Sequence, residues 1–190
     1  MRACLVLLAT ALAGCGTAPP AATRMPGVDP IATQETVRIA VGDVAPGGET
    51  GWGVFIENTS GSNAVVDGYD LVDLSPGVDI LGAAAIPQLP PSGIGPETIV
   101  TDAVRSMVAS RPLVGSTIGP TTTAGWTLGG IILVLLRPRN PGDVSASGIR
   151  LRYHIGAQAF ETLLNSGIEI CAGTSLTSGG PCPLPTAPSS

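Results

Sequence analysis

Apolar and polar residues alternate along much of this chain, which is the pattern of β-strands with one buried face. The clearest example is 149–155, where every second residue is apolar and Arg150, Arg152 and His154 occupy the positions between. A continuous apolar run at 131–136 indicates a strand buried on both faces. Strands are predicted, in chain order, over 35–41, 51–57, 64–74, 78–81, 126–136, 149–155, 158–164 and 168–171.

Turn residues separate these segments and help to set the fold class. Asn, Ser, Gly and Pro gather at 58–63 and at 137–143, as they do between the strands of antiparallel sheets. Seven or eight short strands predict an all-β fold, an antiparallel β-sandwich with one domain over 35–171. The strand order is similar to that of immunoglobulin-like sandwiches in architecture only, because the Cys–Trp–Cys pattern of antibody domains is absent.

A long insertion, about 83–125, interrupts the strands and is rich in Pro, Gly, Ser and Thr. Within it, 97–110 carries apolar pairs every four residues between Pro96 and Pro112, and this predicts one short amphipathic helix. Long insertions are often functional, and this one would then form the roof of a pocket. The interpretation that we favour is a helix that covers an open end of the sandwich.

The N-terminus has the order of a secretory signal: Arg2, a short apolar run, and then small residues. The run is too short to span a bilayer, which takes about 20 apolar residues. The next four residues, Leu12-Ala13-Gly14-Cys15, resemble the lipobox of bacterial lipoproteins. The alternative is an ordinary secreted protein with a chance cysteine at its cleavage site.

The resemblance to lipoproteins implies that the signal peptide 1–14 is removed and that the Cys15 thiol receives a diacylglyceryl group. Two or more acyl chains give stable anchoring, so we expect the protein at the extracytoplasmic face of the cell membrane. Residues 15–34 are rich in Ala, Pro and Thr, a composition that predicts a flexible tether.

Cysteine usage agrees with export. Cys4 leaves with the signal and Cys15 takes the lipid, which leaves Cys171 and Cys182. Outside the reducing cytosol such a pair predicts a disulfide, which would tie the otherwise flexible tail 172–190 to the last strand. The alternative is a redox-active pair, but the close Cys-x-x-Cys spacing that tunes thiol pKa values is absent.

The charge balance argues against nucleic acid as a partner. The chain has 9 basic and 14 acidic residues, whereas phosphate binding needs clustered positive charge. Arg137, Arg139, Arg150 and Arg152 are a candidate basic patch for anionic headgroups or cell-wall polymers. The interpretation that we favour is four separately solvated charges.

Candidate catalytic and metal-binding residues are few. His154 is the only histidine, so a Ser-His-Asp triad would have to use it from the outward face of a strand. We interpret His154 as a solvated strand residue. The acids Asp67, Asp70, Asp73 and Asp79 are candidate calcium ligands, but no EF-hand spacing is present. Strand alternation also predicts that Asp70 points away from Asp67 and Asp73.

These features predict a lipid-anchored, non-catalytic module that binds or scaffolds envelope proteins or polymers. We expect no enzyme activity, cofactor, metal or nucleic-acid partner. The sequence has neither a recognisable set of catalytic residues nor a nucleotide-binding glycine motif. The alternative is a carrier of lipid or another apolar ligand, in which the insertion at 83–125 covers the ligand.

Overall fold

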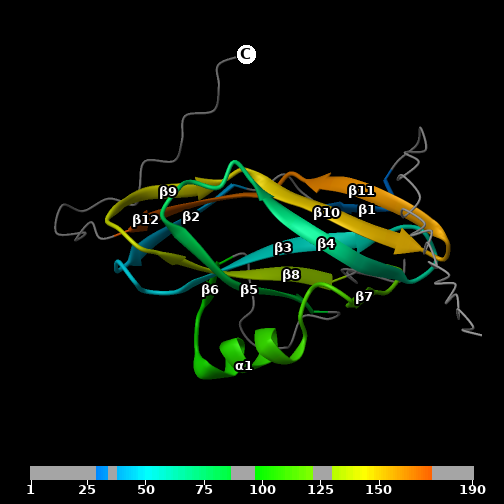
Figure 1. The fold of residues 1–190 in the computed structure, drawn as a ribbon, viewed down its shortest axis with the longest axis horizontal. Coiled ribbons are helices and arrows are strands. Elements are labelled where there is room, and N and C mark those ends of the chain that lie inside the picture. Colours follow the sequence, from blue (N-terminus) through cyan, green and yellow to red (C-terminus); the bar gives the residue numbers. More distant parts are fainter. Residues whose placement is uncertain (1–28, 34–37, 87–96, 122–129, 173–190) are drawn as a thin grey trace, which may run out of the picture.

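The computed structural model describes residues 29–33, 38–86, 97–121 and 130–172, which form twelve β-strands and one α-helix (Figure 1). In chain order the elements are β1 Ile31–Thr33, β2 Arg38–Val44, β3 Thr50–Asn58, β4 Ala64–Val72, β5 Val78–Ile86, β6 Glu97–Ile99, α1 Asp102–Ser110, β7 Thr117–Ile118, β8 Gly130–Pro138, β9 Gly142–Ala146, β10 Gly148–Ile155, β11 Gln158–Leu164 and β12 Gly167–Ala172.

The first layer is a five-stranded antiparallel sheet in the order β1-β3-β8-β5, with β6 also paired to β3. Strand β8 is central, between β3 and β5. Helix α1 lies against the face of this sheet that points away from the rest of the molecule (Figure 1). The other face of the sheet is covered by the second layer.

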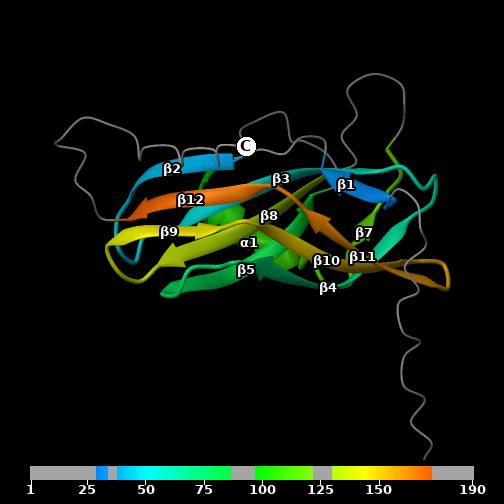
Figure 2. The same cartoon turned by 90° about the horizontal axis from the view of Figure 1, so that it is seen from above.

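The second layer consists of two sheets that continue into each other, β11-β10-β4-β7 and β2-β12-β9. Only Ser147 separates β9 from β10, and β12 pairs β9 much as β11 pairs β10, so 142–172 forms one long bent hairpin (Figure 2). At the bend the backbones approach closely: a Cβ on Gly148 would lie 2.6 Å from the Leu164 carbonyl oxygen. Strand β2 adds to β12 in parallel.

Two apolar cores follow from this arrangement. Residues at alternate positions of β8, such as Ile132 and Val134, face the main core between the layers. The positions between, such as Leu133 and Leu135, face a smaller core beneath α1, where Val108 packs. Because β8 is covered on both faces, its continuous apolar run is accounted for.

The predicted all-β sandwich is confirmed: the protein has two layers of strands, which are antiparallel apart from the β2–β12 pair, and one short helix. Segments with clean alternation were located most accurately, since 158–164 coincides with β11 and 149–155 falls within β10. The expected seven or eight strands were too few. Strands β1, β6, β7 and β9 were not predicted, because each has only two to five residues.

Two predicted boundaries need correction. The tether predicted over 15–34 overlaps β1, whose Ile31 is fully buried in the main core, so the folded part extends at least to Asp29. The insertion predicted from residue 83 begins later, because β5 continues to Ile86 and pairs β8 along its length. The signal 1–14, Cys15 and the tail from 173 onward lie outside the described residues.

The predicted helix is present but shorter than 97–110. Thr101 caps it, since its Oγ1 accepts a hydrogen bond from the Val104 backbone N at 3.3 Å, as N-cap threonines do. The first three predicted residues form β6 and pair with β3 instead. Helix α1 therefore covers a face of the first sheet, rather than an open end of the sandwich as we had favoured.

Candidate functional site

A groove runs beside α1, where the helix, strand β5 and the segment after the helix meet. Its volume is about 580 Å³, within the range of about 300–1,000 Å³ that is usual for small-molecule sites. Apolar residues make up most of its lining, and charged side chains come from three separate elements. The lining residues are Glu49, Tyr69, Leu81, Gly82, Ala83, Arg105, Val108, Ala109, Pro112, Leu113, Val114, Leu135 and Arg137.

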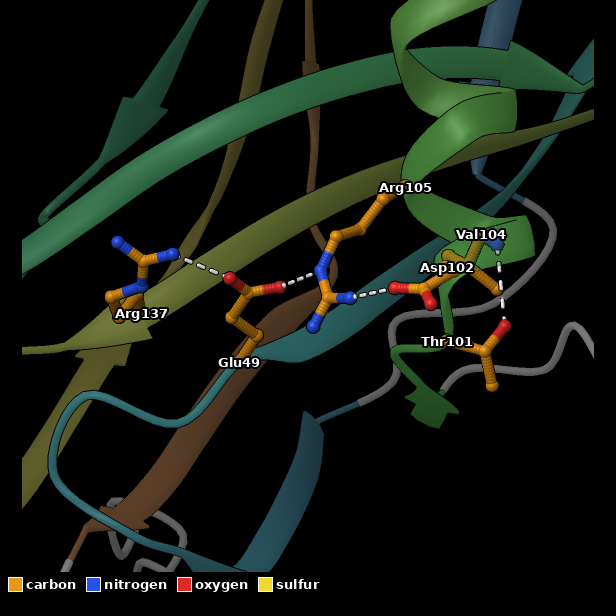
Figure 3. A network of polar contacts seen from close by, with 6 residues as sticks. All are labelled: Glu49, Thr101, Asp102, Val104, Arg105 and Arg137. Carbon is orange, nitrogen blue, oxygen red and sulfur yellow. Dashed lines mark hydrogen bonds and ion pairs between the residues drawn. The ribbon is translucent and has the colours of Figure 1, made fainter.

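Three charged side chains meet at one part of this groove. Glu49 Oε2 accepts a hydrogen bond from Arg105 Nε at 2.6 Å, and Glu49 Oε1 accepts one from Arg137 Nη2 at 2.5 Å (Figure 3). Glu49 precedes β3, Arg105 lies on α1 and Arg137 lies on β8, so the fold alone brings them together. Asp102, which is almost fully exposed, pairs with the outer side of Arg105 at 2.5 Å.

The electrostatics of this cluster are set by the two guanidinium groups. Hydrogen bonds from Arg105 and then Arg137 hold the pKa of Glu49 below its usual value. The same Glu49 hydrogen bond raises the pKa of Arg105, so Glu49 and Arg105 both stay charged at neutral pH. Nε of Arg137 is shielded from solvent and has no acceptor among the described residues.

The rest of the groove is apolar and open. Leu81 and Val114 are large apolar residues on its rim that remain substantially exposed. Gly82 faces α1, where a Cβ would approach Val108 Cγ1 to 3.0 Å. The absence of a side chain at this position therefore lets α1 pack closely on β5. Burial raises the pKa of the Tyr69 phenol at this end of the groove.

His154 is a partly exposed strand residue, as predicted. Its Nδ1 lies 2.8 Å from Asp67 Oδ1, and both side chains reach solvent on the outer face of the second layer. The prediction that Asp70 points away from Asp67 was wrong. A β-bulge between β4 and β10 shifts the register after Val66, and both acids therefore face outward.

The four candidate acids do not form a calcium site. Asp67 pairs with His154, Asp70 Oδ2 with Arg152 Nη1 at 2.8 Å, Asp79 with Arg139, and Asp73 accepts a hydrogen bond from Ser147 Oγ at 2.7 Å. Within the described ranges no cluster of three or more metal-ligating side chains occurs.

The four candidate arginines also fail to form one basic patch. Arg137 and Arg139 lie at the end of β8 in the first layer, whereas Arg150 and Arg152 lie on β10 in the second. Each pairs with a carboxylate: Glu49, Asp79, Glu161 and Asp70, respectively. Separate solvated charges, the interpretation that we favoured, describe these side chains better than a patch does.

Of the cysteines for which a role was predicted, the structure describes only Cys171. Cys171 is buried in β12, but Cys182 and Cys15 lie outside the described residues, so the disulfide and the lipid attachment stay predictions. No helix in the described part of the chain is long and apolar enough to cross a membrane.

Sequence reasoning missed Glu49 and Arg105 as site residues, and it considered Arg137 only as part of a basic patch. Glu49 lies 56 positions from Arg105 and 88 from Arg137. No local spacing signals such an arrangement. The helix prediction was the one available hint, because it placed Arg105 on a helix within the insertion.

Comparisons with known proteins add little to this description. No protein-family model matches the chain, and no curated protein matches it. Among solved structures, the VesB protease of Vibrio cholerae is similar at 10% identity and a TM-score of 0.34, over 71% of this chain and 30% of that one. The PapD-like domain 7 of human CEP192 is similar at 11% identity and a TM-score of 0.35, over 83% and 97%. Similarity at this level does not extend to function.

Proposed function

We propose that this protein is an extracytoplasmic lipoprotein that serves as a non-catalytic binding module of the cell envelope. In this proposal Cys15 carries the lipid, and the groove beside α1 is the binding surface. The observation that carries it is the groove itself: an apolar, open concavity of about 580 Å³ with charged side chains at one part. The proposal assigns no catalytic residue, cofactor or metal.

The anchoring half of the proposal is supported by the lipobox-like sequence that ends in Cys15. Strand β1 begins at Ile31, 16 positions after that cysteine, so the sandwich starts soon after the lipid. An acylated Cys15 would therefore hold Ile31 within about 55 Å of the bilayer surface.

A second candidate is a carrier of an apolar ligand, with the insertion as a pocket roof. In its favour, residues of the insertion from Arg105 to Val114 line the groove and most of the lining is apolar. Against full enclosure, α1 packs Val104, Met107 and Val108 onto the sheet. A carrier of this kind would hold its ligand in an open groove beside the helix.

Anchoring is tested by Cys15→Ser in the native host. The wild-type protein is expected to incorporate labelled fatty acid and to partition with membranes in high salt, whereas the variant is processed into the soluble fraction. Both proteins should show the same thermal midpoint. Membrane retention of the unlabelled variant, or absence of label in the wild type, contradicts the anchor.

The binding surface is tested with a photo-crosslinking residue at Val114, on the groove rim, and at Leu163, on the outer face of the second layer. The two side chains are similarly exposed, at 50% and 46%, so they sample solvent alike. Crosslinks to an envelope component are expected from position 114 in cells and not from 163. Equal crosslinking at both positions, or none at 114, contradicts the groove as the binding surface.

A further inference from the structure

One part of the groove is lined by charged side chains and the remainder is apolar, and this division indicates which kind of ligand fits. Among the charged residues that line it, Arg105 and Arg137 are cationic and Glu49 is anionic. Both Glu49 oxygens already accept a hydrogen bond from an arginine. The groups that remain available to a ligand are therefore hydrogen-bond donors on the two arginines, because each guanidinium has five N–H groups and no acceptor.

The neighbouring acids balance the charge of Arg105 but leave some of its N–H donors unoccupied. Asp102 pairs with Arg105 on its solvent side and does not line the groove. Asp79 pairs with Arg139, and neither of these two residues lines the groove.

The apolar part continues from the charged part along β5. Asp79 of β5 is opposite Arg137 on β8, and Ala83, four residues further along, accepts a hydrogen bond from Leu113 N at 2.8 Å. Four residues of strand span about 13 Å. The groove between these points presents Leu81, Gly82 and Val114, a surface that buries methylene groups without offering them polar partners.

An added peptide strand is a poorer occupant than an acyl chain. A peptide needs a regular row of free backbone groups along the edge. On β5 the pairing register shifts between Ile80 and Gly82, which interrupts such a row. Further along, the Ala83 carbonyl is occupied by Leu113, and Ala84 pairs with Pro112.

We propose that the groove binds a free single-chain amphiphile with a carboxylate head, which Arg105 and Arg137 bind while the acyl chain lies across Gly82 towards Val114. This inference rests on the proposed function, because it takes the groove as the binding surface. Glu49 acts as a positioning residue that holds the two guanidinium groups. A fatty acid is the simplest molecule with this chemistry.

The test measures binding of laurate and of uncharged dodecanol to the full chain carrying Cys15→Ser, which keeps any attached lipid out of the measurement. Laurate is expected to bind at least about tenfold more tightly, since hydrogen bonds to charged groups contribute more than neutral ones. The double variant Arg105→Gln/Arg137→Gln should remove this difference and leave dodecanol binding unchanged. Arg150→Gln is the matched control, because its side chain is 49% exposed against 48% for Arg105.

Groove occupancy is tested by filling the apolar part. Val114→Trp is expected to weaken laurate binding about tenfold or more, while Leu163→Trp leaves it unchanged, with thermal midpoints reported for every variant. Equal affinity for laurate and dodecanol, or no laurate binding by the folded protein, overturns the proposal. So does tighter binding to phosphatidylglycerol vesicles than to monomeric laurate, which identifies a membrane surface as the ligand. If laurate fails while crosslinking from position 114 persists, the ligand class is wrong and the proposed function stands.

Discussion

Tyr153 Oη accepts a hydrogen bond from the backbone N of Ile31 at 3.2 Å, across 122 residues of sequence and inside the main core. The bond joins β10 in the second layer to β1 at the edge of the first. Both residues are fully buried, so water cannot replace either partner. This hydroxyl therefore adds a link between the two layers to the β1–β3 pairing that holds the N-terminal strand.

Tyr153→Phe is expected to destabilise the protein by about 1–3 kcal/mol, the usual cost of a buried backbone N–H that loses its acceptor. Urea unfolding of the purified protein measures the change. Tyr69→Phe, which removes the hydroxyl of a half-buried tyrosine in the groove, is the control and should cost less. Equal effects of the two variants would contradict the role of the Ile31 bond.

Alkaline pH should destabilise the protein through the same residue. Burial raises the pKa of Tyr153 from the usual 10.0 to about 12. A pKa raised by folding means that the stabilisation is complete below pH 10 and is lost as the pH rises towards 12. Urea midpoints between pH 9 and 12 should therefore fall more steeply in the wild type than in Tyr153→Phe. Parallel curves would contradict this assignment.

Acid pH should act through Glu49. Its pKa is lowered in the folded protein by Arg105 and Arg137, so its contribution to stability is present above the usual glutamate pKa of 4.5 and is lost as the pH falls below it. Glu49→Gln is expected to flatten the stability profile in this acid range. Glu161→Gln, on the outer face of the second layer, is the control and should leave the wild-type slope intact.

Asn58 should be among the most sensitive polar positions. It is fully buried, its Nδ2 donates to the Ser62 and Ile118 carbonyls at 2.8 and 2.9 Å, and its Oδ1 accepts from Ser60 N. Asn58→Ala leaves these groups unpaired, and we expect a loss of about 3 kcal/mol or more in chemical unfolding. Asn63→Ala, an exposed position in the same turn, should lie within about 0.5 kcal/mol of wild type.

The bend of the long hairpin should not tolerate a side chain. Gly148→Ala would place its Cβ 2.6 Å from the Leu164 carbonyl oxygen, which is backbone and cannot rotate away. We expect a loss of about 3 kcal/mol, read from the thermal midpoint. Gly119→Ala is the matched control, because its nearest neighbour would lie 3.9 Å away; a similar loss there would show that the cost is not steric.

The sequence predicted strands most accurately where apolar residues recur at every second position without interruption. Strands β10 and β11 alternate cleanly and were located within one residue. The orientation of Asp70 was wrong because a single extra residue in β4 reverses the alternation, and a pattern of alternation carries no mark of such a bulge. Strand β1 was missed because its three residues follow a Pro- and Thr-rich stretch.

The candidate site was beyond sequence reasoning for a different reason. Arg105, Glu49 and Arg137 meet only after the helix has packed on the first sheet. Each is unremarkable in its own segment, and their contact depends on the strand order β3-β8-β5 and on the side of the sheet that the helix takes. The amphipathic pattern predicts a helix with one apolar face, but it does not say on which side of the sheet the helix packs.

Strand β8, covered on both faces, has a consequence for recognition. Backbone amides in such a strand exchange with solvent only when large parts of a protein open together, so β8 should contain the slowest-exchanging amides of the domain. Leu135 and Arg137 of this strand form part of the groove floor. The floor is therefore preorganised, and a ligand that binds there loses little free energy to ordering the protein.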